Sequence, residues 1–180
     1  GDMGGIIANA ASPSVTANLR FGLNGDKDGF IYTEAARTMT MSADIAAAKI
    51  VKFGTGILAI SKDQRSFDQT TAASFNWVVN EGQLTLNTFG ASGTGSITLN
   101  GQATQLNLRA QNMDARNLVY TMGSINTVDN AIIDWDAGMN DSISTIGAIN
   151  VTNTATGSLQ NDVPARLRFN FTNSRLRTFL

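Results

Sequence analysis

Apolar and polar residues alternate in short runs along most of the chain. Near the C-terminus, for example, Leu167, Phe169 and Phe171 alternate with two arginines and an asparagine. A period of two is typical of a strand with one buried face, because successive side chains point to opposite sides. The same pattern predicts further strands over residues 15–21, 30–32, 38–42, 57–60, 75–79, 84–86, 96–99, 104–109, 118–120 and 131–135.

The spacing of these strands leaves two architectures open. Strands recur roughly every ten residues, separated by Gly, Asn, Asp and Ser, which fits either an antiparallel β-sandwich or a parallel β-helix with coils of ~20 residues. Asn100-Gly101 favours a local hairpin. A repeated element, a glycine followed closely by two inward apolar residues as in Gly82-Gln83-Leu84-Thr85-Leu86, favours the β-helix. We predict an all-β parallel β-solenoid, with the antiparallel β-sandwich as the alternative.

The chain is expected to form one domain after a short lead-in. Residues 1–14, which end in Ser12-Pro13-Ser14, predict a loose lead-in segment, and residues 15–180 predict a single β-solenoid domain, a fragment of a larger secreted protein. Residues 43–53 are ambiguous, since Ser42 could cap a helix and Gly54 could end it. The strand-like neighbours on both sides favour strand over helix there.

Composition narrows the functional classes. Only 15% of residues are charged and the net charge is −1, so no general field attracts nucleic acid or an anionic membrane. Cysteine and histidine are both absent, which excludes disulfides, thiolate zinc sites and catalytic Cys or His residues. We expect an extracellular or bacterial cell-surface protein. No apolar run reaches the length of a membrane span, and residues 1–5 do not read as a signal peptide.

The middle of the chain resembles the autotransporter-associated β-strand repeat, which occurs in the passenger regions of secreted bacterial surface proteins. The residues that carry the resemblance fall in two groups: Lys52, Gly54, Gly56, Leu58 and Ile60, then Val79, Asn80, Gly82, Leu84 and Leu86. The clear match covers roughly a fifth of the chain. It departs from the repeat at residues 67–71, which lack the glycines usual in that gap.

The resemblance implies a right-handed parallel β-helix displayed outside the cell. It implies no catalytic residues and no cofactor, because the repeat is a structural unit. No part of the chain resembles the membrane barrel of an autotransporter, so the resemblance covers passenger-type sequence alone.

One loop is a candidate calcium site. Asn24, Asp26 and Asp28 place oxygen ligands at alternating positions, Gly29 follows, and Glu34 lies beyond. The final acid falls one residue early for a calcium loop and the first position is Asn, so a solvated turn is the alternative interpretation.

Two further clusters have structural interpretations that we favour. Asp134 and Asp136 flank Trp135 with Cα atoms roughly 6.6 Å apart, a separation compatible with inverting glycosidases, but strand alternation alone would point both carboxylates outward. The C-terminal end contains four arginines that could bind phosphate: Arg166, Arg168, Arg175 and Arg177. Their alternation with apolar residues predicts instead that they form the solvent-facing side of a strand. The Phe and Met residues are predicted to form the core.

Three functions follow from this pattern. The first is a non-catalytic β-helical stalk of a secreted or cell-surface protein that carries or forms an adhesive surface. The second is a self-assembling subunit of an extracellular filament, coat or fibre, in which open strand edges pair with another copy. The third is a polysaccharide-cleaving enzyme. The partners compatible with the first two are a glycan, a cell-surface receptor or a second copy of the chain.

Overall fold

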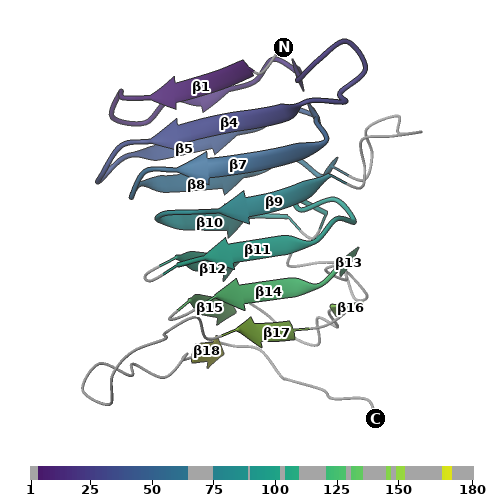
Figure 1. The fold of residues 1–180 in the computed structure, drawn as a ribbon. Coiled ribbons are helices and arrows are strands. Elements are labelled where there is room, and N and C mark those ends of the chain that lie inside the picture. Colours follow the sequence, from purple (N-terminus) through teal and green to yellow (C-terminus); the bar gives the residue numbers. More distant parts are fainter. Residues whose placement is uncertain are drawn as a thin grey trace, which may run out of the picture.

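The structure, a computed structural model, is a parallel β-solenoid. It describes residues 4–64, 75–88, 90–101, 104–109, 121–128, 131–135, 145–146, 149–152 and 168–171. Within these ranges the chain forms strands joined by turns, and every strand pair is parallel. The strands stack coil upon coil down the long axis (Figure 1).

The described strands form two seven-stranded sheets that face each other across the core. The first sheet contains, in spatial order, β1 (Gly4–Ala8), β4 (Asp28–Thr33), β7 (Lys49–Phe53), β9 (Asn76–Val79), β11 (Ile97–Asn100), β14 (Ile125–Val128) and β17 (Ile149–Thr152). The second contains β2 (Ser14–Val15), β5 (Thr38–Met41), β8 (Ile57–Ile60), β10 (Gln83–Leu86), β12 (Gln105–Leu108), β15 (Ile132–Trp135) and β18 (Arg168–Phe171).

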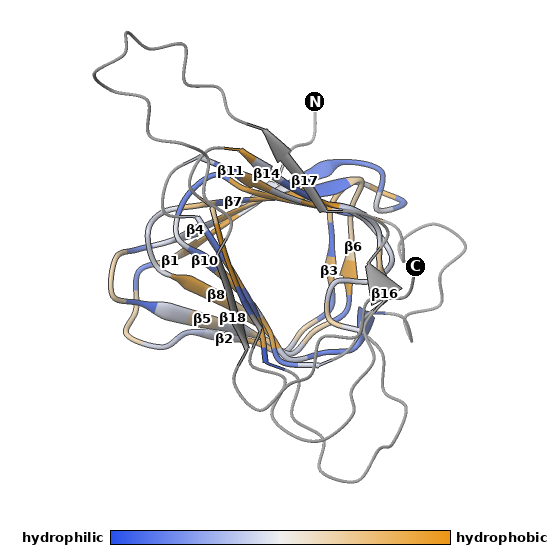
Figure 2. Ribbon diagram, turned by 90° about the horizontal axis from the view of Figure 1, so that it is seen from below, coloured by the Kyte–Doolittle hydropathy of each residue, from blue (hydrophilic) through white to orange (hydrophobic). Residues whose placement is uncertain are grey.

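A third, narrower side is described at some levels of the solenoid. It contains two short pairs, β3 (Leu19–Arg20) with β6 (Ile45–Ala46) and β13 (Thr121–Met122) with β16 (Thr145–Ile146). Seen along the axis, the three sides enclose one core (Figure 2). In Figure 1 the strands of the first sheet run to the left in front and those of the second run to the right behind, while the chain descends. The solenoid is therefore right-handed.

The predicted parallel β-solenoid is confirmed, and with it the strand interpretation of residues 43–53, which contain β6 and β7. The prediction of a hairpin at Asn100-Gly101 is wrong. The strands on either side of it, β11 and β12, lie in different sheets and each pairs in parallel with strands of neighbouring coils. Gly101 has φ +113°, so it supplies a left-handed turn, but the turn makes a corner of the coil.

Two boundaries also differ from the predicted ones. Residues 15–21 do not form one strand, because the chain turns a corner between β2 and β3. Residues 4–8, predicted as part of a lead-in, form β1 and pair with β4, so the described solenoid begins before residue 15.

The core consists of columns of inward side chains that stack from coil to coil. The glycine element predicted from the sequence works in this way: Leu84 and Leu86 of β10 lie in register with Leu58 and Ile60 of β8, and the four side chains are fully buried. In the first sheet a column contains Ile50, Trp77, Ile97 and Ile125. Uninterrupted columns of this kind make one continuous core from the strands of many coils.

Two buried polar contacts complete this core. The Trp77 indole Nε1–H donates to the Ser92 carbonyl at 3.1 Å, and its ring packs against Phe75 with centroids 5.2 Å apart. On the third side the buried Gln64 amide donates to the Ala43 carbonyl at 3.0 Å, while its oxygen accepts from the Ile45 N–H at 2.9 Å. The Gln64 side chain thus pairs with the backbone of the preceding coil as a strand would.

The prediction that the Phe and Met residues form the core is right only in part. Met39, Met41 and Phe75 are buried, whereas Phe30 and Phe53 lie half-exposed on the outward side of the first sheet. Alternation assigns residues to a shared side of a strand, but it does not say which side is inward when both sides carry apolar residues.

We expect alanine at Gly82 to destabilise the chain more than alanine at Gly101. Both glycines have positive φ, but a Cβ on Gly82 would lie 2.6 Å from the carbonyl oxygens of Gly54 and Gly56, whereas among the described residues the atom nearest to a Cβ on Gly101 is the Asn80 carbonyl oxygen at 3.9 Å. Backbone strain alone costs about 1 kcal/mol, and the added overlap should raise the loss for Gly82→Ala to about 3 kcal/mol or more. Urea unfolding of both variants measures the difference. Equal losses would contradict close stacking at this corner.

Candidate functional site

The most distinctive side-chain cluster lies where two adjacent coils turn from the first sheet to the second. One coil contributes Lys52, Gly54 and Gly56, and the next contributes Glu81 and Gly82. We call these five residues the lysine corner. It joins the two sequence segments that carry the repeat-like pattern, because β7 pairs with β9 and β8 pairs with β10.

Lys52 occupies an inward position that its neighbours fill with apolar side chains. Its Cα pairs with Ile31 in one adjacent coil and Val79 in the other, and its side chain is fully buried. A buried ammonium group is costly unless hydrogen bonds replace its hydration. The sequence pattern identified Lys52 as part of a repeat, but only the structure shows that it points into the core.

Three carbonyl oxygens surround the Lys52 ammonium group. Nζ donates to the Gly54 carbonyl at 2.6 Å, to the Glu81 carbonyl at 2.9 Å and, more weakly, to the Phe53 carbonyl at 3.3 Å. An ammonium group has three N–H donors, so these contacts use its full capacity. Because Glu81 belongs to the next coil, the side chain cross-links two coils from inside.

Glu81 closes the same corner from the other side. The Gly54 N–H donates to Glu81 Oε2 at 2.9 Å, so backbone and side chain of the two coils bind each other in both directions. Burial lowers the pKa of Lys52 from 10.5 to about 8, and the negative charge of Glu81 opposes this shift. The role of Glu81 cannot be predicted from the sequence, because an acid before a glycine also fits a solvated turn.

The geometry supports a structural rather than a chemical role for the lysine corner. All three acceptors of Lys52 are backbone carbonyls, and the side chain is closed off from solvent, so no substrate reaches the amine. The corner fixes the register of two coils at the point where the chain changes direction.

The residues of the predicted calcium loop make ion pairs with lysines. Asp26 Oδ2 lies 3.5 Å from Lys27 Nζ, and Asp28 Oδ2 lies 2.8 Å from Lys49 Nζ. Asp28 belongs to β4 rather than to the loop that contains Asn24. Within the described ranges, no group of three or more His, Cys, Asp or Glu side chains is placed to hold a metal ion. Calcium binding at Asn24, Asp26 and Asp28 stays a prediction.

The predicted acid pair is described only in part. Asp134 lies on the outward side of β15, its Cα in register with Asn107 and Asn170, and its Oδ2 accepts a hydrogen bond from Gln105 Nε2. Asp136 lies outside the described residues. Asp134 thus belongs to a ladder of amide and carboxylate side chains, which is the outward position that strand alternation predicts.

The predicted basic end is likewise described at one position. Arg168 begins β18, where its Cα pairs with Ile132. Arg166, Arg175 and Arg177 lie outside the described residues. In the part of the chain that the structure describes, no helix is long and apolar enough to cross a membrane.

Comparison of the chain with models of known protein families, with curated proteins and with solved structures found no match.

Replacing Lys52 by methionine should destabilise the fold at pH 7. Methionine keeps most of the apolar length but leaves the Gly54 and Glu81 carbonyls without this donor, at a cost of about 1–3 kcal/mol. Chemical unfolding measures the loss, and the surface substitution Lys27→Met controls for the removal of one positive charge. An unchanged midpoint would show that the amine does not link the two coils.

The same variant should differ from the wild type in its pH dependence. Because the folded-state pKa of Lys52 is about 8 and the ordinary value is 10.5, the unfolded chain binds more protons between these two pH values. Wild-type stability relative to Lys52→Met should therefore rise with pH across this window, by about 1–3 kcal/mol. Unfolding curves at closely spaced pH values test the sign. A relative stability that falls over the same window would contradict the lowered pKa.

Glu81→Gln should separate the charge of Glu81 from its hydrogen bond. The glutamine oxygen can still accept the Gly54 N–H, but the charge that opposes the lowering of the Lys52 pKa is lost. We expect the rise in stability to begin about one pH unit lower than in the wild type. Glu81→Ala, which removes both contributions, is the comparison. The same onset in wild type and Glu81→Gln would show that the two charges do not interact.

Proposed function

We propose that the chain is a non-catalytic structural segment of a secreted or cell-surface protein, a rigid β-helical stalk that carries or forms an adhesive surface. The observation that supports this proposal best is the continuity of the stacked columns. Each coil is held to the next by parallel backbone ladders on two sheets and by a shared core. Such a scaffold gains length by adding coils, and its stiffness does not depend on contacts between distant parts of the chain.

The lysine corner supports the same proposal. It joins the two segments that resemble the passenger-type repeat. The buried Lys52 ammonium group and the Glu81 carboxylate each form a hydrogen bond between adjacent coils and so hold them in register. A buried hydrogen-bonded charge favours one arrangement, because a slip between the two coils would remove the Glu81 carbonyl from the ammonium group. Fixed register is the property that a stalk needs.

On the outward side of the second sheet, Gln83 and Gln105 are half-exposed amides at which a glycan or receptor could be recognised, and their partners Thr85 and Asn107 are buried. Gln105 Nε2 donates to Asn107 Oδ1 at 2.7 Å, and Gln83 Nε2 donates to Thr85 Oγ1 at 2.8 Å, so both amides are ordered by these hydrogen bonds. Ordered amides bind hydroxyl-rich ligands at low entropic cost. Gln83 and Gln105 are therefore the first residues to substitute in an adhesion assay.

Negative-stain electron microscopy of the purified chain over a range of concentrations tests the stalk. We expect short, straight rods whose length stays constant as the concentration rises. Long filaments that lengthen with concentration would contradict the stalk and favour the alternative, a self-assembling subunit of a filament or fibre. Round particles would contradict an extended scaffold.

A further inference from the structure

The outward side of the first sheet carries an apolar surface at the end of the solenoid that begins with β1. It consists of apolar side chains at the outward positions of β1, β4, β7 and β9, which we call the apolar face: Ile7, Phe30, Tyr32, Val51, Phe53 and Val78. Phe30, Phe53 and Val78 are half-exposed, whereas Val51 is only 6% exposed. Ile7 is 72% exposed and Tyr32 is 44% exposed. Contiguous apolar surface of this kind marks an interaction site more often than it marks chance exposure.

The apolar face is confined to one region of the molecule. Farther along the same sheet most outward positions are polar, with Thr98 and Asn100 in β11 and Asn126 in β14, and Val128 in β14 is the apolar exception among these four. On the second sheet the outward positions include Thr38 and Thr40 of β5, Gln83 of β10 and Gln105 of β12. The apolar centre is thus bordered by polar residues, which is the usual composition of a protein–protein interface.

The side chains of this face are held in place before any partner arrives. Phe30 and Phe53 stack with ring centroids 6.1 Å apart and planes inclined by 20°. Tyr32 lies against the backbone of the lysine corner, since a Cβ added to Gly54 would be 3.0 Å from Tyr32 Cε2. A face that is already rigid loses little side-chain entropy on binding.

The register of the strands shows which partner fits. Across the sheet, Asp28 pairs with Lys49, Phe30 with Val51, and Tyr32 with Phe53, so three columns run along the face: one charged, one central and apolar, and one aromatic. Rotation by 180° about a line parallel to the solenoid axis brings the charged column of one copy opposite the aromatic column of another. The central column then faces itself.

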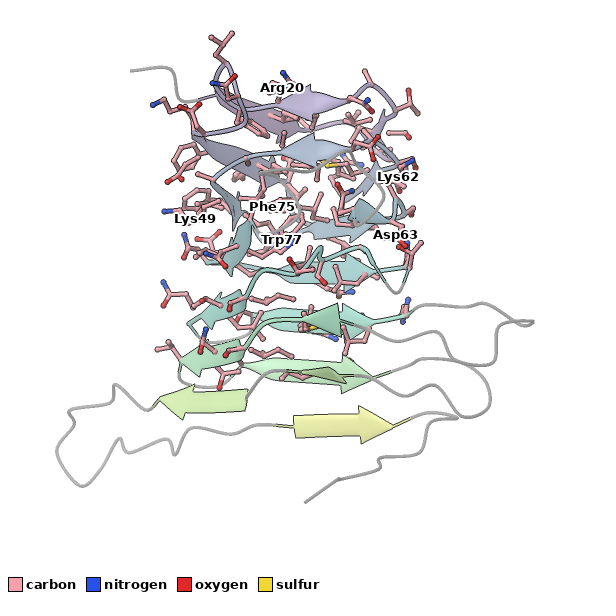
Figure 3. The ribbon with its side chains drawn as sticks, turned by 90° about the vertical axis from the view of Figure 1, so that its right-hand side faces the viewer. Arg20, Lys49, Lys62, Asp63, Phe75 and Trp77 are labelled. Atoms are coloured by element: carbon pink, nitrogen blue, oxygen red, sulfur yellow. The ribbon has the colours of Figure 1, made fainter. Side chains whose placement is uncertain are left out.

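Each contact made by this rotation is favourable. The Tyr32 hydroxyl of one copy comes opposite the Asp28 carboxylate of the other, to which it can donate a hydrogen bond. The Lys49 ammonium group comes opposite the Phe53 ring, an arrangement that gives a cation–π contact. In Figure 3, Lys49 projects outward at the margin of this side of the molecule. The net charge of −1 leaves little repulsion between two copies.

We propose that the apolar face is a lateral homodimer surface on which two copies of the chain pack side by side, with their solenoid axes parallel. The proposal concerns pairing of stalks and does not depend on what the stalk carries. Failure of the dimer would leave the rod expected in electron microscopy unaffected, so the two proposals fail separately.

Sedimentation equilibrium over a wide concentration range tests the dimer. We expect a reversible monomer–dimer equilibrium that Phe30→Lys weakens at least tenfold, because two lysines of the central column would face each other. Thr38→Lys makes the same charge change on the outward side of β5 and should leave the equilibrium unchanged. A chain that stays monomeric, or a dimer that responds to both variants alike, would overturn the proposal.

Thiol cross-linking tests the geometry without relying on Phe30→Lys folding well. The chain contains no cysteine, so single cysteines can be placed at will. Thr98→Cys and Asn126→Cys both lie in the central column, which faces itself at every level of a parallel pair. A short bismaleimide should therefore cross-link both variants to dimers, but not Thr40→Cys on the second sheet. An antiparallel pair would cross-link at most one of the two, and this outcome or equal cross-linking of Thr40→Cys would overturn the parallel arrangement.

Discussion

In-register parallel stacking is the constraint on which the rest of the structure depends. Each residue of a coil lies about 4.8 Å from its equivalents in the coils on either side, so a side chain is always accompanied by its neighbours in the column. Identical charges cannot share a column at this distance. The chain meets the constraint with few charges overall, with an amide pair such as Asn80 and Asn100, and with opposite charges where charges do stack, as in Asp28 and Lys49.

Lys52 is the exception that the constraint permits. It lies in an inward column between Ile31 and Val79, which are both uncharged. Its N–H groups donate to the carbonyls of Gly54 in its own coil and Glu81 in the next coil. The corner can present them because Gly54 and Gly82 adopt positive φ and bring the backbones close together. The positions of the glycines and the burial of the Lys52 amine therefore depend on each other.

The sequence predicted the stacking better than it predicted the surface. Leu84 and Leu86 follow Gly82 as Leu58 and Ile60 follow Gly56, and this repetition was enough to expect the coil. The hairpin predicted at Asn100-Gly101 was wrong because a hairpin turn and a corner of a coil both require a residue with positive φ. The turn residues do not determine whether the next strand pairs with the preceding one or joins another sheet. Phe30 and Phe53 were assigned to the core because hydrophobicity alone does not distinguish an inward column from an outward face. The acceptors of Lys52 could not be predicted, since all three are backbone carbonyls and one of them, that of Glu81, belongs to the next coil.

The third side gives the molecule a place to vary. Side-chain contacts between adjacent coils join Asn80 to Asn100, 20 positions apart, and Ser96 to Ser124, 28 positions apart, yet both seven-stranded sheets keep their register. At one level of the third side a single glutamine, Gln64, pairs with the backbone of the preceding coil. Changes of length are thus absorbed on the third side. Over evolutionary time, insertions at that side could introduce new binding loops while the two long sheets, and the rod that they form, are inherited unchanged.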